Sequence, residues 1–267
     1  MLRILFIGDV IGQPGRLAIA NILPRLKEQY QTNITIANGE NLAGGLGITP
    51  ETAGELFLCG VDIITTGNHV WDKKEMLNYI GMDNRIIRPA NYPQGVPGIG
   101  YTFHKVLVSQ EEITIAVLNL SGCVFMQPLD NPFRIAMTII PLLREKTNVI
   151  IIDFHAEATS EKIAFGRYLD GQVSAIVGTH THVQTADETI FPNGTAYITD
   201  VGMTGPIDSV IGTKTELVIN KFLTQMPVKF EVPKGDVVVS AVVINIDLIT
   251  GKSKSIKRIQ EIVTTQK

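Results

Sequence analysis

The chain has 267 residues, of which 45% are hydrophobic and 18% are charged, so it has enough apolar side chain for one large α/β domain. Its formal net charge of -3 gives no general attraction to nucleic acid or anionic lipid, so a phosphate-bearing substrate would need a local positive charge. No run of ~18 apolar residues and no signal-peptide pattern occurs. We therefore expect a soluble, cytoplasmic protein that forms a single domain over residues 1–267.

Apolar, β-branched runs alternate with amphipathic stretches through the first two thirds of the chain, which is typical of βα units around a largely parallel sheet. The first run, Leu2 to Ile7, predicts a strand that ends at Gly8-Asp9. A helix is expected from Pro14 toward Tyr30, and Pro24 should kink or shorten it.

The second apolar run, Ile34 to Ala37, ends in the polar segment Asn38-Gly39-Glu40-Asn41. Thr49-Pro50-Glu51 predicts the start of another helix, because a capping hydroxyl is followed by proline and an acid in the first turn. After the motif Gly67-Asn68-His69, a further helix is predicted from Lys73 to Ile80.

Beyond Tyr101 the pattern changes to alternating segments such as Glu112 to Leu118. The tail from Val237 to Ile262 predicts two strands joined near Thr250-Gly251, and a second, mostly antiparallel sheet is expected to hold these segments. Cys59 and Cys123 lack any C-x-x-C companion, so no structural disulfide is expected.

Four of the five histidines lie in three polar motifs that directly follow apolar runs: Gly67-Asn68-His69, Asp153-Phe154-His155 and Gly178-Thr179-His180-Thr181-His182. Ligands of open α/β sheets bind at the carboxyl ends of strands, where such motifs would meet. Together the strand ends supply seven oxygen and nitrogen donors: Asp9, Glu40, Asn41, Asn68, His155, His180 and His182. That set exceeds one tetrahedral zinc site and suits two adjacent ions that share a carboxylate. With a hydroxide bound, two divalent ions would leave a charge of ~+1, which attracts phosphate.

Taken singly, each motif also has a purely structural interpretation. His180 and His182 could be a hydrogen-bonded pair at a strand end, and His155 could be a satisfied core histidine. Turn chemistry accounts for Asn38 and Asn91. The repetition of polar motifs at five strand ends favours a metal site.

The ordered set Gly8-Asp9, Gly39-Glu40-Asn41, Gly67-Asn68-His69, His155 and Gly178-Thr179-His180-Thr181-His182 resembles the calcineurin-like metallophosphoesterases. Their usual motifs are D-x-H, G-D, G-N-H-[DE], H and G-H-x-H. Here Ile11 replaces the first histidine, and Glu40 followed by Asn41 replaces the bridging aspartate. Both departures match the YmdB-like branch, over essentially the whole chain. The resemblance implies a four-layer α/β/β/α sandwich of two mixed sheets flanked by helices.

The same resemblance implies a binuclear centre, usually iron or manganese, that hydrolyses phosphodiesters such as 2′,3′-cyclic nucleotides through a metal-bound hydroxide. Carried over by residue, it assigns the first ion to Asp9, Asn41 and His182 and the second ion to Asn68, His155 and His180, with Glu40 as the bridge. The amide oxygen of Asn41 favours iron or manganese over zinc or magnesium.

His69 would lie beside the phosphate and assist the leaving group, with a role in orienting other groups as the alternative. The expected partner is a small phosphodiester, and the branch also allows RNA-related regulation and a homo-oligomer. Specificity should lie in loops such as Leu42 to Ile48 and Gln127 to Phe133.

Other classes of protein fit the sequence poorly. The segment Gly8 to Gly15 lacks the G-x-G-x-x-G spacing of a dinucleotide site, and His155-Ala156-Glu157 has no P-C-x-x-C partner that would complete a zinc deaminase. No G-x-S-x-G or P-loop motif occurs. The remaining alternative is a regulatory protein that binds a phosphorylated ligand or RNA at its metals with little turnover.

Overall fold

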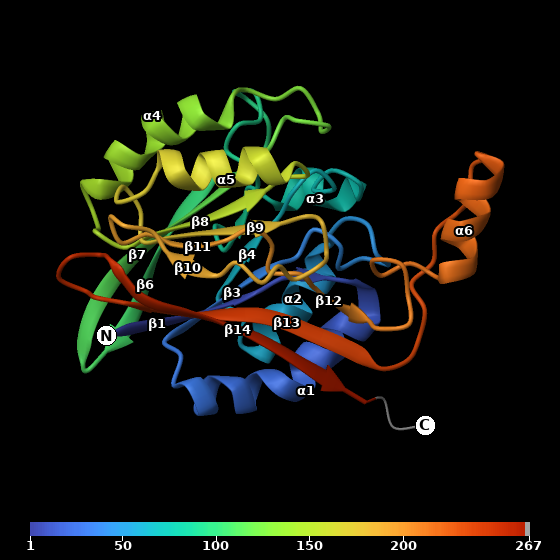
Figure 1. Cartoon of the computed structure of the whole chain (residues 1–267), viewed down its shortest axis with the longest axis horizontal. Coiled ribbons are helices and arrows are strands. Elements are labelled where there is room, and N and C mark those ends of the chain that lie inside the picture. The colour runs from blue at the N-terminus through green and yellow to red at the C-terminus, as the bar shows by residue number, and fades with distance from the viewer. Residues whose placement is uncertain (265–267) are drawn as a thin grey trace.

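The computed structural model describes residues 1–264 as two mixed β-sheets with helices on their outer faces (Figure 1). The first sheet contains β1 (Leu2–Ile7), β2 (Asp9–Val10), β3 (Ile34–Asn38), β4 (Ile63–Thr65), β5 (Ile86–Ile87), β12 (Met203–Pro206), β13 (Val237–Ile246) and β14 (Ser253–Val263). The second contains β6 (Tyr101–Val108), β7 (Glu111–Ser121), β8 (Ile150–His155), β9 (Ala175–Thr179), β10 (Thr189–Ile190) and β11 (Ala196–Ile198). The helices are α1 (Gly12–Tyr30), α2 (Pro50–Cys59), α3 (Lys74–Tyr79), α4 (Pro132–Arg144), α5 (Thr159–Tyr168) and α6 (Thr215–Thr224).

Three apolar cores separate the layers. In β1, Leu5 and Ile7 pack toward α1 and α2, whereas Ile4 and Phe6 pack against the second sheet, because successive side chains of a strand point to opposite faces. The outer face of the second sheet is covered by α4 and α5, where Phe154 stacks on Phe165. The predicted four-layer α/β/β/α sandwich is confirmed.

The predicted helices form near their expected positions. At α2, Thr49 and Thr52 make a reciprocal capping box, in which each hydroxyl accepts from the backbone N–H of the other residue, at 3.3 and 2.9 Å. Of the two effects expected of Pro24, shortening does not occur, since α1 runs from Gly12 to Tyr30 with Pro24 inside it, and the kink stays a prediction.

The predicted place of the C-terminal hairpin is also wrong. Strands β13 and β14 pair antiparallel as expected, but β13 lies beside β1 in the first sheet. The second sheet is mostly parallel, through the pairs β7–β8, β8–β9 and β9–β11. The reason is that β13 is buried on both faces, with Val243 against the helices and Val242 against the second sheet, as a central strand requires.

Helix α6 stands apart from the sandwich, and Val218 is its buried residue (Figure 1). After it the chain returns to the sandwich through residues 225–236 and enters β13. Cys59 and Cys123 are both free thiols. Within residues 1–264, the helices are too short or too polar to cross a membrane. The single-domain assignment stays a prediction, and residues 265–267 lie outside the described part of the chain.

Candidate metal centre

The carboxyl ends of strands from both sheets meet at one place. Asp9 follows β1, Glu40 and Asn41 follow β3, and Asn68 and His69 follow β4 in the first sheet. From the second sheet, His155 ends β8, and the segment containing His180 and His182 follows β9. All seven predicted ligands contact at least one other member of the set: Asp9, Glu40, Asn41, Asn68, His155, His180 and His182.

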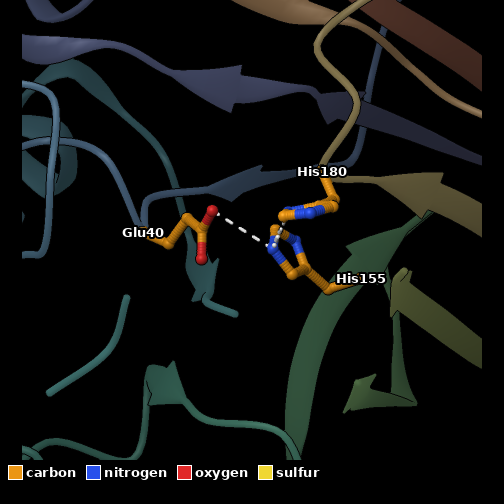
Figure 2. Close-up of side chains that lie close together, drawn as sticks. All are labelled: Glu40, His155 and His180. Atoms are coloured by element: carbon orange, nitrogen blue, oxygen red, sulfur yellow. Dashed lines mark hydrogen bonds and ion pairs between the residues drawn. The ribbon is translucent and has the colours of Figure 1, made fainter. Parts of the chain in front are cut away.

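Three donor atoms crowd around Nε2 of His155. Glu40 Oε1 lies 3.1 Å from it, Asn68 Oδ1 3.0 Å and His180 Nδ1 3.0 Å. Figure 2 shows Glu40, His155 and His180 converging from separate segments. Their donor atoms lie within 4.8 Å of one another, as expected of ligands to a shared ion.

A second group is formed by Asp9, Glu40 and His182, whose donor atoms also lie within 4.8 Å of one another. Asn41 Nδ2 lies 3.2 Å from Glu40 Oε1 and 3.3 Å from His182 Nε2, so its side-chain amide lies beside this second group. Glu40 therefore belongs to both groups, where a bridging ligand would have to be.

These residues fit a pair of cations. Asp9 is fully buried, and its Oδ1 has no hydrogen-bond donor within the described residues, which is costly for a carboxylate unless a cation is nearby. The donors are oxygen and nitrogen atoms, which suit iron, manganese and zinc. The buried carboxylate of Glu40 and the imidazole of His155 are each at most 1% exposed.

The pKa values of the buried ligand residues show how their charges balance one another when no cation is bound. Burial would lower the pKa of His155, but the Glu40 carboxylate outweighs it and raises the pKa to about 9. Burial would raise the pKa of Glu40, but the charge and hydrogen bond of His155 lower it to about 2. Burial raises the pKa of Asp9 to about 6, while burial and His155 lower that of His180 to about 3. Without a cation, the raised pKa favours the protonated form of His155, and a cation bound there would displace that proton.

Glycines leave room for this convergence. A Cβ atom on Gly67 would lie 2.3 Å from the His155 ring and 2.4 Å from Glu40 Oε2, so a larger residue before Asn68 would displace both side chains. A Cβ on Gly178 would lie 1.8 Å from the carbonyl oxygen of Thr199. Both motifs therefore need glycine, because neighbouring atoms approach the backbone too closely to leave room for a side chain.

The His180-Thr181-His182 segment has an unusual backbone. His180 and His182 have φ angles of 100° and 66°, a region that costs roughly 1–3 kcal/mol for residues other than glycine. Buried Lys162 donates to the carbonyl of Thr179 and to Asp200 Oδ2, both at 2.7 Å. Asp200 in turn accepts from the backbone N–H of Thr181 at 3.1 Å. This ion pair holds the segment that presents both histidines.

A second polar layer lies beneath the ligands. Asp153 is fully buried; Oδ1 accepts from Thr179 Oγ1 at 2.7 Å, and Oδ2 accepts from Asn38 Nδ2 at 3.0 Å and from Thr65 Oγ1. Because the Thr179 hydroxyl donates to Asp153, it can only accept from His155 Nδ1, which lies 2.9 Å away. The chain Asp153–Thr179–His155 therefore places a proton on Nδ1, so that Nε2 is the nitrogen that would bind a cation.

Sequence reasoning missed this layer. The turn chemistry expected of Asn38 is present, since its Oδ1 accepts from the backbone N–H of Glu40 at 3.1 Å, but its buried Nδ2 also donates to Asp153. The detectable signal was an acidic residue inside an apolar strand, two positions before His155 and so on the same face. Lys162 gave no such signal, because it lies in an ordinary amphipathic pattern.

His69 lies at the edge of the centre. Its backbone N–H donates to Glu40 Oε2 at 3.2 Å, and its ring Nδ1 lies 2.8 Å from Asp72 Oδ2. Its side chain is 31% exposed, and it lines a cavity of about 390 Å³ together with Glu40 and His182. Because Nδ1 of His69 contacts Asp72, Nε2 is the ring nitrogen that would be available to a molecule bound in the cavity. Glu157 lines the same cavity, and its Oε2 lies 3.1 Å from His180 Nε2.

A neighbouring cavity of about 400 Å³ is lined by Asn68, His180 and the loop residues Phe125, Met126 and Gln127. Leu46 lines the first cavity, so each of the two loops expected to set specificity contributes to a wall beside the centre. A larger cavity of about 600 Å³, between α1 and β14, includes none of the seven predicted ligands.

Comparison with known proteins places this chain in a family. The model of the YmdB-like protein family matches residues 5–259. A Bacillus subtilis protein named 2′,3′-cyclic-nucleotide 2′-phosphodiesterase is 51% identical over 258 residues, which cover 97% of this chain and 96% of that protein.

Two solved structures are also similar. A Thermus thermophilus protein described as hypothetical has a TM-score of 0.89 and 40% identity, and it covers 98% of this chain and 99% of its own. A Mycoplasma pneumoniae protein described as a novel phosphatase has a TM-score of 0.90 and 37% identity, covering 98% of this chain and 93% of its own. The chain belongs to the YmdB-like protein family.

Proposed function

We propose that this chain is a phosphodiesterase that hydrolyses 2′,3′-cyclic nucleotides at two metal ions. The observation that carries the proposal is the position of Glu40, which is shared by two groups of potential ligands and lies beside His69 in an open cavity. The named activity of the 51% identical Bacillus relative supports the substrate class.

In this proposal, Asp9, Asn41 and His182 would hold one ion, Asn68, His155 and His180 would hold the other, and Glu40 would be shared by both. Two ions bound there would stabilise the negative charge of the phosphate and acidify the attacking water. Iron and manganese suit this set of carboxylates, amides and imidazoles.

The protein's own groups supply the remaining steps. Water adds its oxygen to phosphorus and releases a proton to solvent as the bond from phosphorus to the ribose 2′ oxygen breaks, and that ribose oxygen takes up a proton from the protein, which solvent then restores. His69 donates this proton from Nε2, while the contact of its Nδ1 with Asp72 Oδ2 at 2.8 Å orients the ring. The product is the 3′-phosphate of the nucleoside.

The test is turnover of 2′,3′-cyclic AMP by protein reconstituted with manganese or iron, with the product identified by chromatography. We expect 3′-AMP from the wild type and at least a hundredfold slower turnover by Glu40→Gln, because the amide keeps the shape but loses the charge between the ions. Metal-loaded wild-type protein that binds the nucleotide without turnover would contradict the proposal and favour the regulatory alternative.

A further inference from the structure

The cavity of the metal centre has one apolar side. Besides Glu40, His69 and His182, it is lined by Leu46, Ile211 and Phe230. We call these three residues the apolar wall; they are 41%, 51% and 40% exposed, respectively. Large apolar side chains that remain exposed next to charged groups are typical of a site for a ligand with a charged end and an apolar end.

The apolar wall is built from three distant segments that are fixed to one another. Ile211 is tied directly to the centre, because its carbonyl oxygen lies 2.9 Å from Nδ1 of His182. Next to Phe230, the carbonyl of Glu231 accepts from the backbone N–H of Lys214 at 2.9 Å.

Val232 packs against the loop that contains Leu46. A Cβ on Gly45 would lie 2.7 Å from the side chain of Val232, so only glycine allows this approach. Leu46 therefore stays close to the segment that carries Phe230, and the apolar wall is largely formed before a ligand binds.

The position of His69 relates the apolar wall to the substrate. His69 lines the same cavity as the apolar wall, whereas the neighbouring cavity is lined by Asn68, Phe125 and other residues that do not include it. Under the proposed function, His69 gives its proton to an oxygen of the ribose. The ribose would then lie beside His69, in the cavity that the apolar wall also lines, so its base would be able to reach that wall.

We infer that the apolar wall binds the nucleobase of the substrate, with the ring of Phe230 stacked on the base. This inference rests on the proposed function. Stacking discriminates little between bases of the same size because every base has a π-face, so adenine and guanine should be accepted about equally. Purines should be preferred to pyrimidines because the larger ring system stacks more strongly.

The test compares 2′,3′-cyclic AMP with a base-free analogue, methyl riboside 2,3-cyclic phosphate. For Phe230→Ala we expect KM for 2′,3′-cyclic AMP to rise about tenfold, and KM for the analogue to change less than about twofold, because only the former loses a stacked base. Phe230→Trp should keep the wild-type KM for both. The matched control is Phe125→Ala, which removes a ring that is 89% exposed in the neighbouring cavity and should leave both values unchanged.

The outcomes separate the two proposals. If the wild type hydrolyses both substrates but Phe230→Ala changes their KM values equally or not at all, the apolar wall does not bind the base and the proposed function stands. An effect of Phe125→Ala on 2′,3′-cyclic AMP alone would place the base in the other cavity. If metal-loaded wild-type protein hydrolyses neither substrate, the proposed function fails and the inference fails with it.

Discussion

Replacing Thr179 with valine tests whether the buried layer beneath the centre prepares His155 to bind metal. Valine has nearly the shape of threonine but lacks the hydroxyl that accepts from His155 Nδ1 at 2.9 Å and donates to Asp153 at 2.7 Å. Without it, the Nδ1 proton is no longer fixed and the imidazole can turn or change tautomer. Loss of such a supporting hydrogen bond typically weakens metal binding about 10- to 100-fold, or about 1.4–2.7 kcal/mol.

Thr65→Val is the matched control. Thr65 also donates its hydroxyl to Asp153, but it makes no hydrogen bond to His155. Both variants leave the buried carboxylate with one donor fewer, so each should lower the free energy of unfolding by about 1–3 kcal/mol. Only Thr179→Val should weaken metal binding.

The assay is calorimetric titration of metal-free protein with manganese, with thermal unfolding followed by circular dichroism on the same samples. Equal loss of manganese affinity in the two variants would mean that the effect passes through general destabilisation. Unchanged affinity in Thr179→Val would show that His155 needs no support from Thr179. Either result refutes the reasoning about the Asp153–Thr179–His155 chain.

Three further predictions follow from the centre. Elemental analysis of protein purified without chelators should find two ions of iron or manganese per chain, and a value that stays at one after reconstitution would contradict the shared position of Glu40. His69→Ala should slow hydrolysis of cyclic nucleotides far more than that of p-nitrophenyl esters, whose leaving group needs little protonation, and should leave the metal content unchanged; an equal loss would indicate charge stabilisation instead. Because the pKa of His155 is raised to about 9 and a metal replaces its proton, manganese affinity should rise about tenfold per pH unit from pH 7 toward 9 and then level off, and an affinity that is constant over this range would be evidence against His155 as a ligand.

The sequence alone predicted which residues the fold brings together in the candidate metal centre. Each predicted ligand lies just beyond an apolar run, and parallel strands bring their carboxyl ends together whatever the details of packing. The helix cap at Thr49 could also be predicted from the sequence, because a helix cap involves residues only three positions apart. Local chemistry and strand direction sufficed for these features.

Only the tertiary structure decided what surrounds the ligands. The tail hairpin joined the first sheet because β13 fits between β14 and β1, and strand pairing of this kind leaves no trace in local pattern. The hydroxyl of Thr179 donates to Asp153 because neighbouring strands place Oγ1 of Thr179 2.7 Å from Oδ1 of Asp153. The apolar wall unites Leu46 and Phe230, whose separation along the chain hides their proximity. Hydrogen bonds and packing between distant segments depend on the register of strands and the path of loops, and these are fixed only when the whole chain has folded.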